Sequence, residues 1–241
     1  MAPTIVNTPE LIRAMAQDAD IQSCLPQTLE KIAKYRYAHN FTWLGRPIIQ
    51  WPQDIVAMQE LIWNVKPDLV IETGVAHGGS LILYASLLEL IGSGEVLGID
   101  VEIRPHNRRD IERHPLAKRT SLLEGSSISP DIVAAAREAA RGKQRVLVVL
   151  DSNHTHEHVL SEVRLYSPLV TKGSYLVVFD TVIEDVPASC YPDRPWRPGD
   201  NPKTAVRQFL SETDRFEIDR DLQDRLLLTA APDGYLRCVK D

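Results

Sequence analysis

The chain has 241 residues, of which 44% are hydrophobic and 25% are charged, and its formal net charge is −6. This composition fits one globular α/β domain with added segments, and the acidic balance argues against a nucleic-acid partner, which favours a basic face. No apolar run reaches the roughly eighteen residues of a membrane span, and we see no signal-peptide pattern, so no membrane association is expected. The three scattered cysteines indicate no disulfide framework, and we expect a cytoplasmic protein.

The first part of the chain is expected to be helical. Apolar residues recur at helical spacing through residues 8–40, and Pro26 is predicted to divide this stretch into two helices. Residues 41–52 are rich in aromatic residues and prolines and are predicted to be loop-like. We therefore expect residues 1–45 to form a helical cap or a subunit contact, and residues 46–241 to form a single ligand-binding domain.

From residue 55 onward, apolar runs alternate with helical patterns. A helix is predicted over residues 55–65, with Asp54 as its cap. Strands are predicted to end at Ile71, Ile99, Leu123, Leu150 and Phe179, with helices between them at 79–91, 105–114, 130–141 and 156–166. Such continuous apolar strands belong in a sheet that helices cover on both faces. The alternation therefore predicts an α/β fold with a mostly parallel sheet.

A proline-rich segment interrupts this alternation after Asp180. Five prolines fall between residues 187 and 202, which excludes a helix or a central strand there. Long loops in compact domains are usually functional, and Tyr191 and Trp196 accompany these prolines, so we predict that residues 185–203 form a substrate lid. Beyond the lid we expect a helix at 204–212, strands at 216–218 and 226–229, and a turn leading into 235–239.

A glycine-rich turn follows the first predicted strand of the alternation. Glu72 and three glycines, Gly74, Gly78 and Gly79, lie directly before the next predicted helix. A phosphate-binding loop would need a lysine after its last glycine, and a dinucleotide fingerprint would need a different glycine spacing. A carboxylate here would repel phosphate, but it suits a ligand with a positive amino group and no phosphate. S-adenosylmethionine (SAM) is such a ligand.

Two later strands end in residues that fit the rest of this ligand. Asp100 closes the second strand, where an acid typically accepts hydrogen bonds from ribose hydroxyls. Ser126 and Ser127 follow the third strand, where an adenine could lie, and His77 in the glycine turn could contact the ligand. Each acid taken alone could equally be a solvated strand end, but their order along the chain favours a SAM site.

The fourth and fifth strands each lead into an aspartate, Asp151 and Asp180. Neighbouring strands lie about 4.8 Å apart, so both carboxylates would project from one edge of the sheet. Two such charges are costly unless a cation lies between them or one of them takes up a proton, and Mg²⁺ fits this arrangement. It could lower the pKa of a substrate hydroxyl that then attacks the SAM methyl group. The alternative is that both aspartates only cap the turns that follow them.

Three histidines, His154, His156 and His158, follow Asp151 closely. His154 lies just after the strand and can face the site as a general base, and His158 lies one helical turn further on. A zinc site made of all three is disfavoured, because His156 would point away from the other two in a helix. A histidine that merely completes a helix start is the remaining alternative.

These motifs resemble those of the SAM-dependent O-methyltransferases of the cephalosporin hydroxylase-like and rhamnosyl O-methyltransferase family. The matching positions, between about residues 40 and 240, are Gln50, Pro52, Asp54, Glu72 to Ser80, Asp100, Gly125 to Ser127, Asp151, His154, His158 and Gly173 to Thr181. The resemblance implies a Rossmann-like class I methyltransferase sheet of seven strands with a reversed last hairpin. It also implies helices on both faces and an N-terminal helical extension.

The same resemblance implies a role for each matching residue. SAM contacts are expected from Gln50, Glu72, Gly74, His77, Ser80, Asp100, Ser126, Ser127 and Asp151. Asp151 and Asp180 are expected to hold Mg²⁺, with the Thr181 hydroxyl as a further ligand because neither neighbour of Asp180 is an acid or an amide. His154 and Asp151 are the expected catalytic residues.

The resemblance also implies what the protein acts on. Members of that family methylate hydroxyls of sugars or antibiotics in natural-product pathways, often as oligomers. We therefore expect a homo-oligomer that methylates a rhamnosyl or other deoxysugar hydroxyl of a small glycosylated or nucleotide-sugar molecule.

Three other functions stay open. A β-lactam tailoring protein of the same family would act at the cephem nucleus and would be distinguished by screening acceptors. A non-catalytic SAM-binding subunit would bind SAM without transferring its methyl group. An NAD-dependent oxidoreductase is disfavoured by the spacing of Gly74 and Gly78, and comparing the binding of SAM with that of NAD would separate the two.

Overall fold

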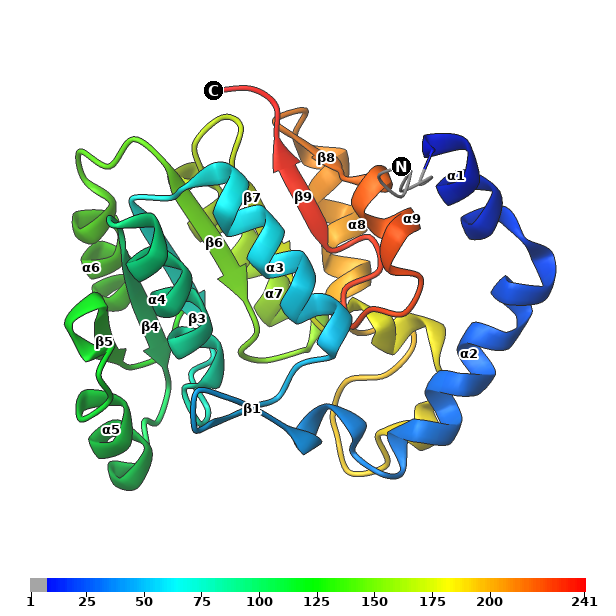
Figure 1. Ribbon diagram of the computed structural model, residues 1–241, viewed down its shortest axis with the longest axis horizontal. Helices are drawn as coiled ribbons and strands as arrows, with labels where there is room; N and C mark the ends of the chain where they lie inside the picture. Colours follow the sequence, from blue (N-terminus) through cyan, green and yellow to red (C-terminus); the bar gives the residue numbers. More distant parts are fainter. Residues whose placement is uncertain (1–7) are drawn as a thin grey trace, which may run out of the picture.

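The computed structural model describes residues 8–241, and within them a seven-stranded sheet forms the centre of the fold (Figure 1). Its strands are β3 (Leu69–Thr73), β4 (Glu95–Asp100), β5 (Thr120–Glu124), β6 (Val146–Leu150), β7 (Tyr175–Val178), β8 (Phe216–Ile218) and β9 (Tyr235–Cys238). Their order in the sheet is β5-β4-β3-β6-β7-β9-β8. Strands β3 to β7 pair in parallel, and β9 pairs antiparallel with β7 and β8. The predicted sheet with a reversed last hairpin is confirmed.

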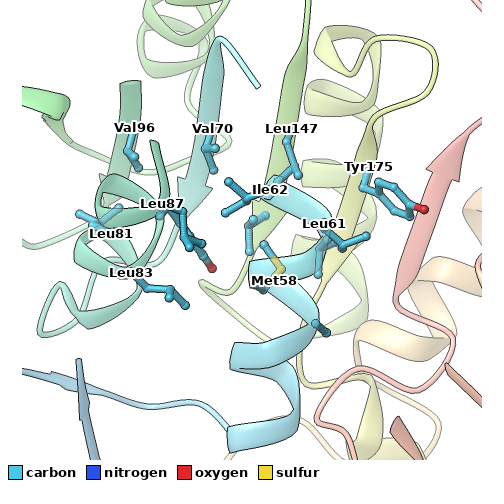
Figure 2. Packing of buried hydrophobic residues seen from close by; sticks show 14 of the residues in the cluster. Met58, Leu61, Ile62, Val70, Leu81, Leu83, Leu87, Val96, Leu147 and Tyr175 are labelled. Carbon is cyan, nitrogen blue, oxygen red and sulfur yellow. The ribbon is translucent and has the colours of Figure 1, made fainter. Parts of the chain in front are cut away.

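Helices cover both faces of the sheet, because its central strands carry apolar side chains on both sides. These helices are α3 (Pro52–Val65), α4 (Gly79–Ile91), α5 (Pro105–Glu112), α6 (Pro130–Ala140), α7 (His156–Tyr166), α8 (Pro202–Glu212) and α9 (Arg220–Leu226). Helices α3 and α4 pack on one face, and α6, α7 and α8 pack on the other. Figure 2 shows the first of these layers, in which Met58, Ile62 and Leu87 lie over Val70 and Leu147 of the sheet. The bounds of α4 and α7 are those predicted.

The order of the strands changes direction between β3 and β6. The chain proceeds outward from β3 through β4 to β5, and then returns to start β6 on the other side of β3. Thr73 and Leu150 are paired at the carboxyl ends of these two strands. In open α/β sheets, ligands bind at such a reversal, outside the carboxyl ends of the strands. The segments that follow β3 and β6 therefore mark the place to look for a site.

Helices α1 (Pro9–Gln17) and α2 (Ala19–Ala33) form an arm beside the sheet, and each of their residues is at least partly exposed (Figure 1). The predicted break at Pro26 is wrong, because α2 continues through it. The helical region is interrupted at Asp18 instead, between α1 and α2. The Asp18 carboxylate accepts hydrogen bonds from the backbone N–H groups of Asp20 and Ile21 and so caps α2. Residues 1–7 lie outside the described part, and a capping or oligomerisation role for residues 1–45 stays a prediction.

Residues 41–52 are more regular than the predicted loop. After a 3₁₀ turn, η1 (Tyr37–Asn40), strands β1 (Phe41–Trp43) and β2 (Arg46–Ile48) form an antiparallel hairpin. A β-carbon added at Gly79 would overlap the backbone of this hairpin, so the absence of a side chain there lets the hairpin lie directly on the start of α4. The predicted domain boundary at residue 45 falls in the turn of this hairpin.

The C-terminal part departs from the prediction at one strand. The strand predicted at 226–229 is wrong, because α9 extends to Leu226 and Leu227 then has a φ of 56°, which no strand residue adopts. The proline-rich segment is largely irregular as predicted, with short 3₁₀ turns η4 (Thr181–Asp185) and η5 (Ala188–Cys190) at its start. Two further 3₁₀ turns are η2 (Ala117–Arg119) and η3 (Ser167–Leu169). Among residues 8–241, no helix is both long and apolar enough to cross a membrane.

Candidate active site at the strand-order reversal

The glycine turn after β3 packs against the end of β6. Gly74 has a φ of 95°, and a β-carbon added there would overlap the backbone carbonyl of Asp151. Only glycine can adopt this positive φ and also avoid the overlap with the Asp151 carbonyl. The turn and the first residue after β6 are therefore in contact, which brings two groups of predicted site residues together at the reversal of strand order.

Glu72 lies at the base of this turn and is completely buried. The Ser80 hydroxyl donates a hydrogen bond of 2.8 Å to its Oε2, while Oε1 has no hydrogen-bond partner among the described residues. Burial raises the pKa of Glu72 to about 8, which outweighs the lowering by the hydroxyls of Ser80 and Tyr84. A buried carboxylate with one unpaired oxygen is chemically suited to a cationic amino group.

Gln50 also contacts the Tyr84 hydroxyl. Its amide donates a 3.4 Å hydrogen bond to that hydroxyl, and its Oε1 is buried without a partner in the part of the chain that the structure describes. Gln50 and Glu72 thus each offer an unpaired oxygen beside the same tyrosine. Both atoms are acceptors, as the ammonium group of a ligand requires.

Asp100 supports the glycine turn from the end of β4. One carboxylate oxygen accepts hydrogen bonds from the backbone N–H groups of Val75 (2.8 Å) and Ala76 (3.1 Å), and the other accepts one from Glu102 (3.2 Å). Ala76 has a φ of 45°, a conformation that needs such support. In the structure Asp100 therefore holds the glycine turn. The ribose contact predicted for Asp100 stays a prediction.

Two residues missed by the sequence analysis hold the same turn from outside. Arg46 of β2 donates hydrogen bonds of 3.0 and 2.6 Å to the His77 carbonyl, and Asn107 of α5 donates one of 2.9 Å to the Ala76 carbonyl. The His77 side chain itself is half-buried. No local pattern marks Arg46 or Asn107, because their partner carbonyls lie about thirty residues away in the chain.

The serines after β5 meet the start of α7. The Ser127 hydroxyl lies 3.1 Å from Nε2 of His158, and the Ser152 hydroxyl donates a 2.8 Å hydrogen bond to Glu162, which is fully buried. The Ser126 carbonyl accepts hydrogen bonds from the backbone and side chain of Ser129, which ends the loop before α6. Because the Ser152 hydroxyl also lies 3.3 Å from Nε2 of His158, the structure places Ser127 beside the segment that follows β6.

Asp151, His154 and Asp180 converge at the carboxyl ends of β6 and β7. One ligand atom of each lies within 4.8 Å of the others, and Nε2 of His154 is 3.1 Å from Oδ2 of Asp180. Withdrawal from water, followed by the charges of Asp180 and Glu72, raises the pKa of Asp151 well above its usual value. Asp180 has a φ of 57°, the strained conformation that is common at functional sites. This cluster of two carboxylates and an imidazole could hold a divalent cation.

The other residues predicted as possible metal ligands make further hydrogen bonds. The Thr181 hydroxyl is buried and donates a 2.7 Å hydrogen bond to the Pro232 carbonyl. His156 lies 2.7 Å from Thr204 and 3.1 Å from Gln208, both on α8. Because His158 faces Ser127 instead, the three histidines do not converge, and the zinc alternative is wrong.

Asp54 is a buried acid that does not play the capping role predicted for it. It was expected to cap α3, but that helix begins at Pro52, and the Asp54 side chain points to the C-terminal segment. There it accepts hydrogen bonds from the Ala230 backbone N–H (2.8 Å), the Tyr235 hydroxyl (2.7 Å) and the Thr229 hydroxyl. Burial, with a smaller contribution from the charge of Asp180, raises the pKa of Asp54 to about 6.

Part of the proline-rich segment lies over His154. The ring of Trp196 meets the His154 ring edge-on at 4.7 Å, and the guanidinium of Arg194 lies 5.1 Å from the Trp196 ring. The Trp196 Nε1 is buried without a hydrogen-bond partner within residues 8–241. Burial and then the charge of Asp180 raise the pKa of Tyr191. The predicted lid residues thus lie next to the cluster of Asp151, His154 and Asp180.

Comparisons with known proteins show the family of this chain. The family model of rhamnosyl O-methyltransferase/CmcI matches residues 35–239. The rhamnosyl O-methyltransferase of Mycobacterium leprae is 30% identical over 200 residues, 81% of this chain and 82% of that protein. The one from Mycobacterium tuberculosis (strain H37Rv) is 31% identical over 204 residues, 81% of this chain and 77% of that protein.

Solved structures agree on the fold. A structure of CmcI with Mg and SAM superposes with a TM-score of 0.59 at 17% identity, covering 84% of this chain and 78% of that one. At this identity the likeness bears on the fold alone. The family model and the two mycobacterial relatives show which family the chain belongs to, because their matches cover most of the chain. The chain belongs to the rhamnosyl O-methyltransferase/CmcI family of SAM-dependent O-methyltransferases.

Proposed function

We propose that this protein is a Mg²⁺-dependent methyltransferase that transfers the SAM methyl group to a hydroxyl of a rhamnosyl or similar sugar unit on a small molecule. The observation that carries the proposal is the cluster of Asp151, His154 and Asp180 directly beside the glycine turn. The names of the mycobacterial relatives support a rhamnosyl acceptor.

The SAM site is proposed along the ends of β3, β4 and β5. Glu72 would take the ammonium group on its unpaired Oε1, with Gln50 beside it, and Gly74, His77 and Ser80 would line the methionine part. Asp100, Ser126 and Ser127 would take the ribose and the adenine. The buried, unpaired oxygens of Glu72 and Gln50 support this placement, because buried polar atoms are rarely left without partners.

The acceptor hydroxyl would lie at the cluster, where Asp151, Asp180 and, as a further oxygen, Thr181 would hold the metal. Their oxygen donors suit Mg²⁺, whose positive charge would lower the pKa of a nearby hydroxyl. His154 would accept the hydroxyl proton as the methyl group moves from sulfur to that oxygen. The edge-on Trp196 ring would exclude water from His154.

The decisive experiment measures transfer of labelled methyl from SAM to a rhamnosylated acceptor, with and without EDTA. We expect EDTA and Asp180→Asn each to abolish turnover, and Mg²⁺ to restore it only in the wild-type protein. Asp214→Asn is the matched control, because that aspartate is exposed and pairs only with Lys240 among the described residues. Turnover that survives both EDTA and Asp180→Asn would exclude the metal from the reaction.

The same assay tests the other open functions. Turnover of a cephem acceptor but of no rhamnosylated one would assign the protein to β-lactam tailoring. SAM binding without transfer to any acceptor would point to a non-catalytic subunit. Light scattering on the same sample would test the predicted homo-oligomer.

A further inference from the structure

We propose that Asp54 is a positioning residue for the metal ligand Asp180, and that it acts through the C-terminal segment 229–235. The inference rests on the proposed function, because it assigns Asp180 to a metal. Asp54 itself lies on α3, in the part of the chain before the sheet begins. It makes none of its three hydrogen bonds to the cluster of Asp151, His154 and Asp180.

The first link joins Asp54 to the segment. Asp54 is completely buried and accepts hydrogen bonds from Thr229, Ala230 and Tyr235. The Thr229 hydroxyl in turn accepts a 2.9 Å hydrogen bond from the Ala231 backbone N–H. One carboxylate therefore organises four residues of a segment that lacks the pairing of a strand up to Tyr235.

The second link joins the segment to both sides of Asp180. Before it, the Val178 backbone N–H donates a 2.8 Å hydrogen bond to the Gly234 carbonyl. After it, the Thr181 hydroxyl donates one of 2.7 Å to the Pro232 carbonyl, and the Val182 backbone N–H donates one of 3.3 Å to the Ala230 carbonyl. Residues 178, 181 and 182 are thus all fixed by the segment that Asp54 holds.

The fit between the segment and β7 is tight. A β-carbon added at Gly234 would overlap the Val178 carbonyl, and the ring of Tyr235 packs edge-on against that of Phe179 at 6.3 Å. A shift of the segment would therefore be passed on to residues 178–182. Asp180 is sensitive to such a shift, because its φ of 57° is one that the surroundings must impose on a residue other than glycine.

A buried carboxylate is a costly way to hold a loop, since a hydrophobic contact would avoid its desolvation. Three directed hydrogen bonds, however, define the position of the segment more narrowly than apolar packing does. Residues that orient a metal ligand typically change metal affinity by about 10- to 100-fold when they are replaced. We expect a change of this size for Asp54.

The test compares Mn²⁺ binding, followed by the loss of the free-ion EPR signal, in the wild-type protein and three variants. Asp54→Asn replaces one acceptor oxygen by an amide NH₂ group, which is itself a donor and cannot accept from the Thr229 and Tyr235 hydroxyls. Tyr235→Phe removes only one of the hydrogen bonds. Asp219→Asn is the matched control. Its carboxylate accepts hydrogen bonds from the Tyr175 hydroxyl (2.7 Å) and the Leu222 backbone N–H (3.0 Å), and neither partner lies within 178–182 or 229–235. The backbone N–H of residue 219, which donates a 2.9 Å hydrogen bond to the Tyr235 carbonyl, is kept in Asp219→Asn.

We expect Asp54→Asn to weaken Mn²⁺ binding at least tenfold and Tyr235→Phe to weaken it less, with S-adenosylhomocysteine binding unchanged in both. Asp219→Asn should leave Mn²⁺ binding unchanged even where it lowers the melting temperature. Equal Mn²⁺ affinity in wild type, Asp54→Asn and Tyr235→Phe would overturn the inference alone. A wild-type protein that binds no Mn²⁺ would overturn the proposed metal function and this inference with it. If Asp54→Asn does not fold, Tyr235→Phe against Asp219→Asn decides.

Discussion

Replacing Glu72 by glutamine tests the SAM site most directly. The substitution keeps the shape of the side chain and an acceptor for the Ser80 hydroxyl, but it removes the charge. In the folded protein the pKa of Glu72 is raised from 4.5 to about 8, because the carboxyl group is completely buried. The ligand-free fold therefore favours the protonated, neutral acid at neutral pH.

The sign of the effect on stability follows from this rise. Between pH 4.5 and about 8 the folded chain keeps a proton that the unfolded chain has released, so the free energy of unfolding falls as the pH rises through this window. Each pKa unit is worth about 1.4 kcal/mol, so the full loss is on the order of 3 to 6 kcal/mol. Glu72→Gln has no such proton to lose. We expect it to match the wild type near pH 5 and to be the more stable protein at pH 8.5.

Urea unfolding of the ligand-free wild type and Glu72→Gln across pH 5 to 8.5 measures this difference, with Glu60→Gln as the control at a more exposed carboxylate. The difference between the two curves isolates Glu72 from the other buried acids. Parallel curves for wild type and Glu72→Gln would refute the reasoning, because they would mean that Glu72 ionises alike in both states.

Ligand binding supplies the second half of this prediction. S-adenosylhomocysteine should bind Glu72→Gln about 10- to 100-fold more weakly, since a hydrogen bond to a charged group contributes about 1.5–3 kcal/mol. At pH 7 the wild-type carboxyl must also release its proton to pair with the ammonium group. The calorimetric enthalpy should therefore vary with the ionisation enthalpy of the buffer in the wild type but not in the variant.

Three further predictions concern the rest of the site. His154→Gln should lower kcat by about 10²- to 10⁴-fold without changing S-adenosylhomocysteine binding, and a near-normal kcat would exclude His154 as the base. Gly74→Ala should lower the free energy of unfolding in urea by at least about 2 kcal/mol. Gly142→Ala should lower it by less, because Gly142 has a similar positive φ but open space around it. Trp196→Ala should raise the KM for the acceptor and leave SAM binding intact, with the exposed Trp63→Ala as control; an unchanged KM would remove Trp196 from the acceptor site.

Local patterns predicted several elements closely. The helices at 79–91 and 156–166 have the predicted bounds, because a glycine turn and the end of an apolar strand mark their starts. The ends of the five parallel strands were placed within two residues, since continuous apolar runs such as Val146–Leu150 are buried on both faces. Such signals depend only on neighbours in the chain.

Two of the predicted elements failed for different reasons. The apolar run from Leu226 predicted a strand, but α9 extends to Leu226, and Asp54, more than 170 residues earlier in the chain, accepts hydrogen bonds from the Thr229 hydroxyl and the Ala230 N–H group. A strand would need that N–H group for its own pairing. Pro26 predicted a helix break, but the cap at Asp18 sets the start of α2. The Asp54 hydrogen bonds join residues far apart in the chain, so no local pattern contains them, whereas the Asp18 cap is a local signal two and three residues from its donors.

The order of acids after successive apolar strands is visible in the chain before folding, and it implies that they meet at one edge of a parallel sheet, because apolar patterning is a local property. Only the tertiary structure decided that Asp151, His154 and Asp180 come within 4.8 Å, that Glu72 is fully buried with an unpaired oxygen, and that Asp54 faces the C-terminal segment. Distances, burial and pKa depend on groups that are far apart in the chain, and folding alone brings them together.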